Sequence, residues 1–273
     1  MDITPDEMMV FCISRQIKDG ETVVQGLATP LVAAGYLLAR LTHAPNLYFA
    51  SAIGQAMCRY PAPLGLARIE ALWLDRALTT AGFAKVATEV LPTLRPKEFF
   101  RPAQVDPYGN TNNIALGKNY LSTGRQSPRT RLPGSGGIPD VTTFFHHTSL
   151  YVPRHSRVTF VEELDVRSGL GYDLSRSLGN GPVFLVSDLG EFDFFNGKLR
   201  LKYFHPGVTI AQIQARTGFP LEISSQVCET PLPTPEELHL LRTEIDPLGI
   251  RRLELLSGAP RRQMIREILS QET

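Results

Sequence analysis

A strand, loop, helix and second strand near the N-terminus constrain the fold most. The segment "TVVQGLATP" (22–30) joins β-branched residues to a loop of small residues. "PLVAAGYLLARL" (30–41) follows with apolar residues at helical spacing and Pro30 in the first turn. "NLYFASAIG" (46–54) then has the composition of a buried strand. This βαβ order predicts parallel strands joined by a right-handed crossover, hence an open, mostly parallel α/β sheet flanked by helices.

The rest of the chain adds further predicted elements. Thr4 precedes an acidic first turn, which predicts a helix to about Lys18, and 66–81 is also helix-like. Asn196-Gly197 predicts a hairpin turn, and Thr234 with Glu237 predicts a capped helix over 234–245. Strands are expected in "RVTFVEELDV" (157–166), "PVFLVSDLGEFDF" (182–194) and "KLRLKYF" (198–204). Without internal repeats or a low-complexity linker, we expect a single domain over residues 1–273.

Composition excludes several classes of function. Of 273 residues, 42% are hydrophobic and 20% charged, and the net charge is +1, so nothing favours binding to nucleic acid or an anionic membrane. Cys12, Cys58 and Cys228 are too scattered for a disulfide framework, and no ligand spacing predicts a metal site. The first residues lack the basic and apolar regions of a signal peptide, so we expect a cytoplasmic protein.

Four loops are candidates for ligand binding, because open α/β sheets bind ligands beyond the carboxyl ends of parallel strands. They are "GLATP" (26–30), "ASAIGQAM" (50–57), "QVDPYGNTN" (104–112) and "RLPGSGGIPD" (131–140). The glycines of the last loop allow close backbone approach, and their N–H groups can form an oxyanion hole. A purely structural turn explains "GSGG" equally well, and no Walker or dinucleotide fingerprint is present.

Several motifs in combination carry a resemblance to a known family. The chain has "AQVDPYGNTN" (103–112), "RTRLPGSGGIPD" (129–140), "HPGVT" (205–209) and "LRTEIDP" (241–247), in that order. It resembles, over nearly its whole length, the β subunit of family I CoA-transferases of the glutaconate type. "FVEELDVRSGLGYD" (160–173) and "VSDLGEFDF" (186–194) are more similar to the β subunit of the steroid ring-opening CoA hydrolases of cholesterol catabolism.

The resemblance implies a fold, a partner and a ligand. The fold is that of a CoA-transferase β subunit, and the partner is a homologous α subunit in a heterotetramer with two copies of each chain. The active site is expected at the α/β interface. Coenzyme A is expected as part of an acyl-CoA substrate, with no permanently bound cofactor.

The chain departs from the family at the nucleophile. True transferases of the family attack the thioester with a glutamate in a Glu-Ser-Gly pattern after the second strand. Alignment through Gly54 places Ala52 at the glutamate and Ile53 at the serine. No Asp or Glu occurs between His43 and Leu66, so a shift in register cannot restore the carboxylate.

Other family positions are reshaped or retained. Gly26 to Pro30 stands for a "GTGLP"-like loop, and Arg101-Pro102 stands for a glycine pair, so bulkier residues line the expected pocket. Gly136 and Gly137 are retained, and a family backbone N–H in this stretch polarises the thioester carbonyl, so we expect both to be catalytic. The residues expected to bind substrate are Ala52, Ile53, Gly54, Gln104, Tyr108, Asn110 and Ser135.

Four functions remain open at this point. Hydrolytic C–C opening of a cyclic diketo acyl-CoA, with a base from the α subunit, is favoured by the "GLGYD" similarity (169–173). Cofactor-free decarboxylation of a glutaconyl-type CoA is the first alternative, and neither reaction needs a covalent carrier. True CoA transfer to a carboxylic acid and a non-catalytic scaffold subunit are the others.

Further polar residues are interpreted mainly as structural. Cys58 lacks an evident neighbour that would lower its pKa, so a buried thiol is favoured over a nucleophile. At most one of His146 and His147 can face a site, because successive residues on a strand point to opposite faces. Arg131 is a candidate for pairing with a carboxylate or phosphate, or for a surface ion pair. We interpret Glu162 and Glu163 as structural, and Asp106 either as bonding its own turn or as shaping the acyl pocket.

Overall fold

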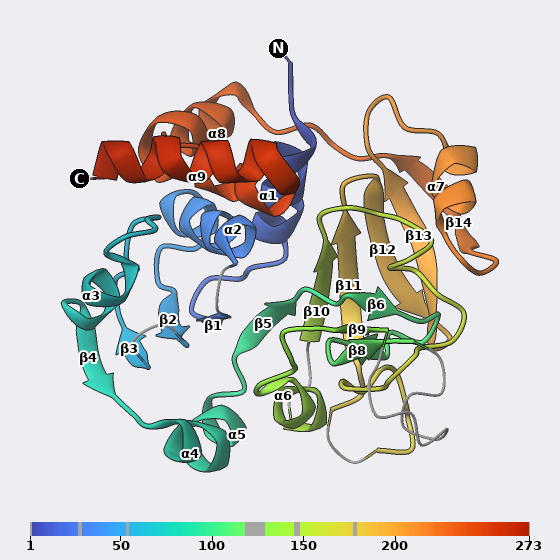
Figure 1. Cartoon of the computed structure of the whole chain (residues 1–273), viewed down its shortest axis with the longest axis horizontal. Helices are drawn as coiled ribbons and strands as arrows, with labels where there is room; N and C mark the ends of the chain where they lie inside the picture. The colour runs from blue at the N-terminus through green and yellow to red at the C-terminus, as the bar shows by residue number, and fades with distance from the viewer. Residues whose placement is uncertain are drawn as a thin grey trace. The chain divides into compact units, whose positions relative to one another are not determined.

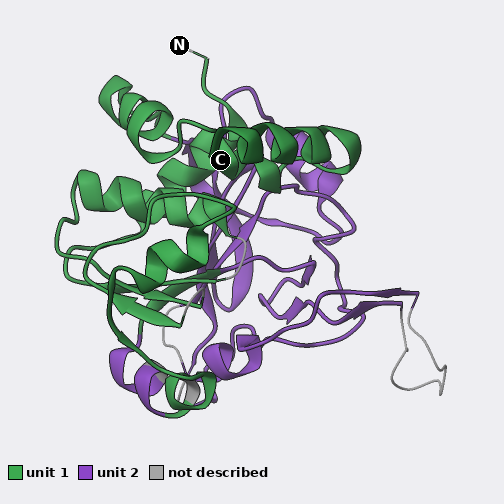
Figure 2. Ribbon diagram, turned by 60° about the vertical axis from the view of Figure 1, so that its left-hand side comes forward, with its two compact units in different colours: residues 1–88, 96–99, 231–273 green, residues 89–95, 100–230 purple. Residues whose placement is uncertain are grey.

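The computed structural model describes residues 2–26, 29–52, 55–117, 129–144, 148–176 and 179–272. The chain divides into two compact units (Figure 2). Unit 1 comprises Met1–Thr88, Pro96–Phe99 and Pro231–Thr273, and unit 2 comprises Glu89–Arg95 and Phe100–Thr230. Whether these units make one domain, as the sequence predicts, stays a prediction.

Unit 1 is built on the predicted βαβ element. Strand β1 (Thr22–Gln25) pairs in parallel with β2 (Tyr48–Ser51), and helix α2 (Pro30–Leu41) connects them. On its other side, β1 pairs in parallel with β5 (Lys97–Phe100). Strands β3 (Ala56–Cys58) and β4 (Ala77–Thr80) continue antiparallel from β2. The parallel crossover predicted from the sequence is confirmed.

The helices of unit 1 come from both ends of the chain. In Figure 1, α1 (Pro5–Arg15), α2, α8 (Pro235–Leu240) and α9 (Gly258–Glu272) lie on one side of β1 and β2. The buried Arg251, in the short 3-10 helix Ile250–Glu254, joins these segments. Its guanidinium forms ion pairs with Asp6 (2.8 Å), Glu7 (3.2 Å) and Asp246 (2.9 Å).

The predicted helix over 66–81 is wrong over most of its length. Helix α3 covers only Ile69–Leu74, and the chain then forms β4, whose Thr79 and Thr80 pair with β3. The β-branched threonines favour extended backbone, and cross-strand pairing prevails over the apolar periodicity of the segment. The chain continues through α4 (Phe83–Lys85), a π-helical turn (Val86–Val90) and α5 (Leu91–Leu94) to β5.

Unit 2 holds a second sheet segment with its own core. Strand β10 (Thr148–Val152) pairs in parallel with β11 (Pro182–Ser187), which continues antiparallel through β12 (Gly190–Phe195) and β13 (Lys198–Phe204). Asn196 and Gly197 have φ values of 49° and 82°, which confirms the predicted hairpin turn. Helix α7 (Ile210–Arg216) leads to β14 (Glu222–Glu229), parallel to β13.

The segment "RVTFVEELDV" does not form the predicted strand. Within 157–166, Phe160 makes a single bridge to Val105, and the N–H groups of Thr159 and Phe160 bond back to Ser156 in a turn. The Phe160 ring stacks on His155 with the ring centres 3.7 Å apart, which buries the aromatic side chain without a ladder.

Short two-stranded ladders complete unit 2. Strand β6 (Gln104–Val105) pairs with β7 (Thr111–Asn112), and β8 (Ala115–Leu116) pairs with β9 (Thr130–Arg131). Helix α6 (Ile138–Phe144) follows the glycine-rich loop.

Parallel pairs lie at the centre of the sheet, hairpins extend them and helices flank them, so the predicted open, mostly parallel α/β class is confirmed. Among the residues described, no helix is long and apolar enough to cross a membrane.

Candidate functional site

The turn "DPYGN" (106–110) is held by its own aspartate. Asp106 Oδ1 accepts hydrogen bonds from the N–H groups of Tyr108 and Asn110, both at 2.9 Å. Its Oδ2 accepts the Asn110 side-chain amide at 2.8 Å. Burial raises the pKa of the Asp106 carboxyl, and the hydrogen bonds from Asn110 and Tyr108 partly oppose that rise. The carboxylate therefore stabilises this turn, as one of the two interpretations of the sequence expects.

Close backbone contacts explain the glycine and asparagine content of this turn. Asn110 Oδ1 accepts the N–H of Gly171 at 2.8 Å, and Tyr108 O accepts the N–H of Tyr172 at 2.7 Å. Gly109 has a φ of 77°, and a side chain there would collide with the rings of neighbouring residues. The turn and the segment around Gly171 thus pack backbone to backbone.

Gln104 and Asn112 form a buried pair of amides beside the turn. Asn112 Nδ2 donates to Gln104 Oε1 and to the Ala115 carbonyl, both at 2.7 Å. Gln104 Nε2 donates to Asp165 Oδ2 at 3.1 Å. The side-chain amides are therefore hydrogen-bonded to other groups of the protein. The expected roles of Gln104 and Asn110 in substrate binding stay predictions. Tyr108 differs from both, because its side chain is exposed.

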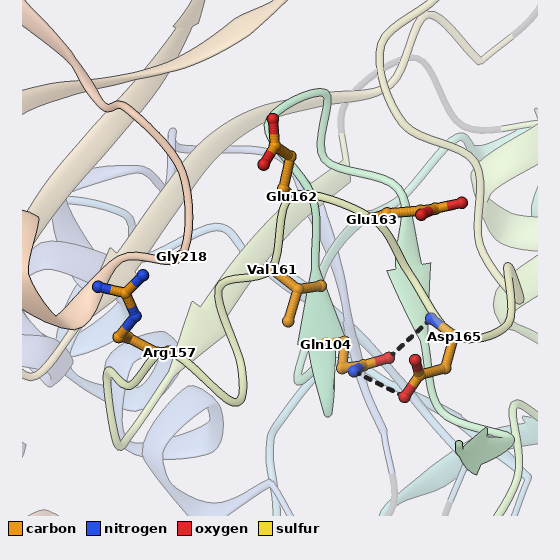
Figure 3. A pocket seen from close by; sticks show the side chains of 7 residues that line it. All are labelled: Gln104, Arg157, Val161, Glu162, Glu163, Asp165 and Gly218. Atoms are coloured by element: carbon orange, nitrogen blue, oxygen red, sulfur yellow. Dashed lines mark hydrogen bonds between the residues drawn. The ribbon is translucent and has the colours of Figure 1, made fainter. Parts of the chain in front are cut away.

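A cavity of about 410 Å³ opens beside Gln104 (Figure 3). Figure 3 shows Glu162 and Glu163 extending away from the Gln104–Asp165 pair, with Arg157 on the opposite side. Two glutamates interpreted as structural therefore line a cavity. Three carboxylates against one guanidinium disfavour an anionic ligand such as a coenzyme A phosphate. The residues lining the cavity are Gln104, Arg157, Val161, Glu162, Glu163, Asp165 and Gly218.

The glycine-rich loop offers backbone donors. Ser135 O accepts from Ile138 N at 3.0 Å, and Gly137 O accepts from Val141 N at 2.9 Å, so these carbonyls are fixed. The N–H groups of Gly136 and Gly137 donate to no acceptor within the described part of the chain. Gly137 has a φ of 80°, and an added side-chain carbon at either glycine would meet no atom within 4 Å. Two neighbouring N–H groups without an acceptor in the described chain are what an oxyanion hole requires.

Ala52 lies at the carboxyl end of β2, in unit 1. Its N–H donates to Gln25 O at 2.9 Å, so the ladder with β1 continues to this position, and its side chain is exposed. Ile53 and Gly54, the other residues expected here, lie outside the described residues. The position aligned with the transferase nucleophile thus presents a methyl group at the edge of the parallel strands.

Glu98 is a carboxyl group that the sequence analysis missed. It lies on β5, 8% exposed, and burial raises the pKa of its carboxyl to about 8. A side-chain carbon added to Gly26, just after β1, would lie 3.7 Å from Glu98 Oε1. The one available signal in the sequence was a glutamate directly before two phenylalanines in "KEFF" (97–100).

The structure describes two of the remaining candidates, Cys58 and Arg131. Cys58 is buried, its Sγ lies 3.6 Å from the Trp73 carbonyl, and burial raises the pKa of its thiol, which disfavours the nucleophilic thiolate. Arg131 is exposed on β9, whereas His146 and His147 lie outside the described residues. Within the described ranges, no cluster of three or more His, Cys, Asp or Glu side chains is arranged to hold a metal ion.

Comparison with known proteins places this geometry in a family. No family model matches the sequence. The chain is 33% identical over 267 residues to the cholesterol ring-cleaving hydrolase IpdB subunit of Mycobacterium tuberculosis H37Rv, covering 93% of this chain and 99% of that one. It is 32% identical to the β subunit of the 3-oxoadipate CoA-transferase of Pseudomonas knackmussii, covering 87% and 91%. The chain belongs to the CoA-transferase family, among its β subunits.

Solved structures agree with this family. The decarboxylase AibA/AibB matches with a TM-score of 0.78 at 32% identity, over 92% of this chain and 98% of that one. Glutaconate CoA-transferase from Acidaminococcus fermentans matches with a TM-score of 0.77 over 94% and 99%, and at 24% identity it shows the fold alone. The CoA-transferase β-subunit fold predicted from the motifs is confirmed. As a β subunit of this family, the chain is part of an enzyme.

Proposed function

We propose that this CoA-transferase-family subunit acts, together with an α subunit, on an acyl-CoA by hydrolytic C–C opening of a cyclic diketo ring. The observation that carries the proposal is Ala52 at the carboxyl end of β2, where a transferase of the family needs a glutamate. Without that carboxylate no glutamyl-CoA intermediate can form. The similarity to a subunit named as a ring-cleaving hydrolase supports the choice of reaction.

The Gly136 and Gly137 N–H groups are proposed to stabilise negative charge on a carbonyl oxygen of the substrate. They are suited to this because no acceptor in the described residues occupies them. A base from the α subunit activates water, hydroxide adds to a ring carbonyl, and the adjacent C–C bond breaks. The pair of electrons moves onto the α-carbon as an enolate, and a proton on that carbon completes the hydrolysis.

The proposal includes the setting of the reaction. The partner is a homologous α subunit in a heterotetramer with two copies of each chain, located in the cytoplasm. Coenzyme A enters as part of the substrate, and no permanently bound cofactor is needed, because water and acid–base groups suffice for this chemistry. Ala52, Ile53, Gly54, Gln104, Tyr108, Asn110 and Ser135 are proposed to shape the binding site for the acyl-CoA.

Decarboxylation is the second candidate, favoured by the 32% identity to the decarboxylase AibA/AibB. In that reaction a glutaconyl-type CoA loses carbon dioxide and leaves a dienolate, which also requires oxyanion stabilisation and a proton. CoA transfer remains an alternative through the similarity to the 3-oxoadipate CoA-transferase, but it requires a carboxylate that Ala52 cannot supply.

The test is a mass-spectrometric assay of the chain co-expressed with the product of its neighbouring gene. A cyclic diketo acyl-CoA and a glutaconyl-type CoA are each supplied in heavy-oxygen water, with and without acetate. Heavy oxygen in a ring-opened acid supports the proposal. Loss of carbon dioxide establishes the decarboxylase instead, and CoA on acetate establishes a transferase. No turnover of either acyl-CoA leaves a scaffold subunit.

A further inference from the structure

One buried carboxyl group of unit 1 has no structural role. Glu98 is 8% exposed, and its carboxyl forms neither a hydrogen bond nor an ion pair with any described residue. Buried carboxyls in folded proteins are almost always paired, because burial without a partner destabilises the charged form strongly. Glu98 therefore lowers the stability of the folded state, so a stabilising role does not explain why a glutamate occupies this position.

The register of the strands places Glu98 on the same face of the sheet as Ala52, the position aligned with the transferase nucleophile. Val24 of β1 is in register with Glu98 of β5 and with Ala50 of β2, so the three side chains share one face. Two residues further along the strands, Gly26 and Ala52 lie on that same face. Neighbouring strands are about 4.8 Å apart, so Glu98 and Ala50 are about two strand spacings apart with β1 between them, and Ala52 lies two residues, about 7 Å, further along β2.

Gly26, which lies between them, has no side chain. A side-chain carbon added there would lie 3.6 Å from Thr29 Cγ2 and 3.7 Å from Glu98 Oε1, so the Glu98 carboxyl extends to the carboxyl end of β1. Ala52, on the far side of Gly26, presents only a methyl group. A carboxyl group is thus available one strand beyond β1, at the edge where the family's nucleophile is absent.

Among the residues that the structure describes, no cation lies beside Glu98 to hold it ionised. Lys97 precedes it on the strand and points to the opposite face, where its Nζ lies 2.7 Å from Glu21 Oε2. Tyr36 of α2 donates its hydroxyl to Val24 O at 3.1 Å, and burial, with the Glu98 charge second, raises the pKa of its phenol, so it stays neutral. With a pKa of about 8, Glu98 is a neutral carboxylic acid at neutral pH and can donate a proton.

We propose that Glu98 is the proton donor of this enzyme, delivering a proton to the enolate carbon of a 1,3-dicarbonyl acyl-CoA after its C–C bond breaks. The assignment rests on the proposed function and adds the acid to it. It holds for the ring-opening and for the decarboxylating reaction, because both break a C–C bond and leave a carbanion that a proton must quench: the enolate of the remaining ring carbonyl in the first and the dienolate of the thioester in the second.

The step balances with water as the only co-reactant. The base of the α subunit removes one proton from water, and the hydroxide forms the new C–O bond. As the C–C bond breaks, its electron pair moves to the α-carbon, and the Glu98 Oε–H proton is transferred there to form a C–H bond. The Glu98 carboxylate then regains the proton that the base removed from water.

The first arm of the experiment measures turnover by the assembled complex. Glu98→Gln keeps the shape of the side chain and removes its acidic proton, and we expect kcat to fall about 100-fold or more. The wild-type rate should fall as pH rises through about 8, where the donor deprotonates. Glu98→Gln should lose this decline, and Glu98→Asp should restore part of kcat. If Glu98→Gln retains the wild-type kcat and the decline, the proposal is wrong.

The matched control is Asp188→Asn in unit 2. Asp188 is another buried carboxyl, whose pKa burial raises to about 6, and its Oδ1 accepts the His155 N–H at 2.7 Å. We expect this variant to keep the wild-type kcat and pH profile per folded complex. An equal loss of kcat in both variants would show a general effect of neutralising buried acids and would overturn the proposal.

The second arm does not depend on turnover. Infrared difference spectra of the complex, wild type against Glu98→Gln, follow the protonated carboxyl band through the pH range, with and without acetoacetyl-CoA. A band that titrates near pH 8 and shifts on addition of acetoacetyl-CoA supports Glu98 as the donor. A titration that acetoacetyl-CoA leaves unchanged overturns it. If wild type turns over neither acyl-CoA, the proposed reaction fails, and this arm still decides the role of Glu98.

Discussion

At the scale of single residues, hydrogen bonding distinguishes the turn at 106–110 and its neighbours from the glycine-rich loop at 131–140, although both were candidates for ligand binding from the sequence. The amides of Gln104, Asn110 and Asn112 are engaged with neighbouring protein groups. The N–H groups of Gly136 and Gly137 remain unoccupied in the described chain. Both motifs are rich in small polar residues and glycine, yet one is fixed inside the protein and the other presents donors outward.

Substitution of Gly136 should therefore affect activity more than stability. A Cβ added at Gly136 would meet no atom within 4 Å, so we expect Gly136→Val to leave the melting temperature of the complex unchanged. It should lower kcat/KM about 100-fold or more, because the bulk next to the N–H blocks the oxyanion position. Steady-state kinetics with calorimetry measures both effects. Unchanged kinetics would indicate that this loop is only a structural turn.

Glu98→Gln should change the pH dependence of stability. The folded pKa of about 8 lies above the ordinary value of 4.5, so the folded state keeps a proton that the unfolded chain releases. In wild type this lowers stability as pH rises from about 4.5 to 8, by up to about 1.4 kcal/mol per pH unit, and the effect levels off above. The stability advantage of Glu98→Gln should grow over that window. Melting temperatures at about pH 5 and pH 8 test this, and a constant difference would contradict it.

The sequence could predict some of these residues and not others. The burial of Cys58 was predicted from the apolar residues around it in the sequence, and burial raises the pKa of its thiol although the charge of Arg76 partly opposes that rise. Glu98 could not be assigned, because its burial and isolation depend on the pairing of β5 with β1, which is distant in sequence. The unoccupied N–H groups of the glycine-rich loop could not be predicted either, because the sequence "GSGG" does not determine the backbone conformation of the loop.

At the scale of elements, capping residues and apolar periodicity predicted helices and strands correctly where the tertiary contacts favoured the same structure. Helix α2 begins at Pro30 as predicted, and Thr234 and Glu237 form the expected reciprocal cap of α8. The errors at 66–81 and 157–166 arose where pairing partners or a turn decided the backbone. Alternation of apolar residues cannot reveal whether a partner strand is available.

Arg251 should be a sensitive point of the elements in unit 1. It is 5% exposed and pairs with Asp6, Glu7 and Asp246, so Arg251→Ala leaves buried carboxylates without their cation. We expect a loss of about 3–5 kcal/mol of unfolding free energy. Urea unfolding measures it. Arg242→Ala, which removes a half-exposed partner of Glu7, should have a smaller effect, and an equal effect would contradict the special role of the buried pair.

At the scale of the whole molecule, the family relationship constrains function more than the bulk properties do. Length, charge and composition give no argument for binding to nucleic acid or an anionic membrane, and they fit many enzymes. The ordered motifs predicted the CoA-transferase β-subunit fold, and the structural matches confirm it. The residues expected to act are divided between the units, Ala52 in unit 1 and Gly136 in unit 2.

Activity should require assembly with the α subunit. Because the base of the proposed reaction is assigned to the α subunit, the purified chain alone should give no measurable turnover of a cyclic diketo acyl-CoA. The co-expressed complex should show turnover, and addition of the α subunit to the isolated chain should restore it. Size-exclusion chromatography with activity measured across the fractions tests this. Turnover at the same rate by the chain alone would place the base within it.

The unpaired carboxyl of Glu98 also has a consequence for protein engineering. Replacing Glu98 by an uncharged residue should raise the melting temperature, because the free-energy cost of burying an unpaired carboxyl group is removed. A library selected for heat resistance alone would therefore accumulate changes at position 98. If Glu98 donates the proton, such selection would yield thermostable but inactive variants. Only a screen that measures turnover as well as thermal stability would retain the glutamate.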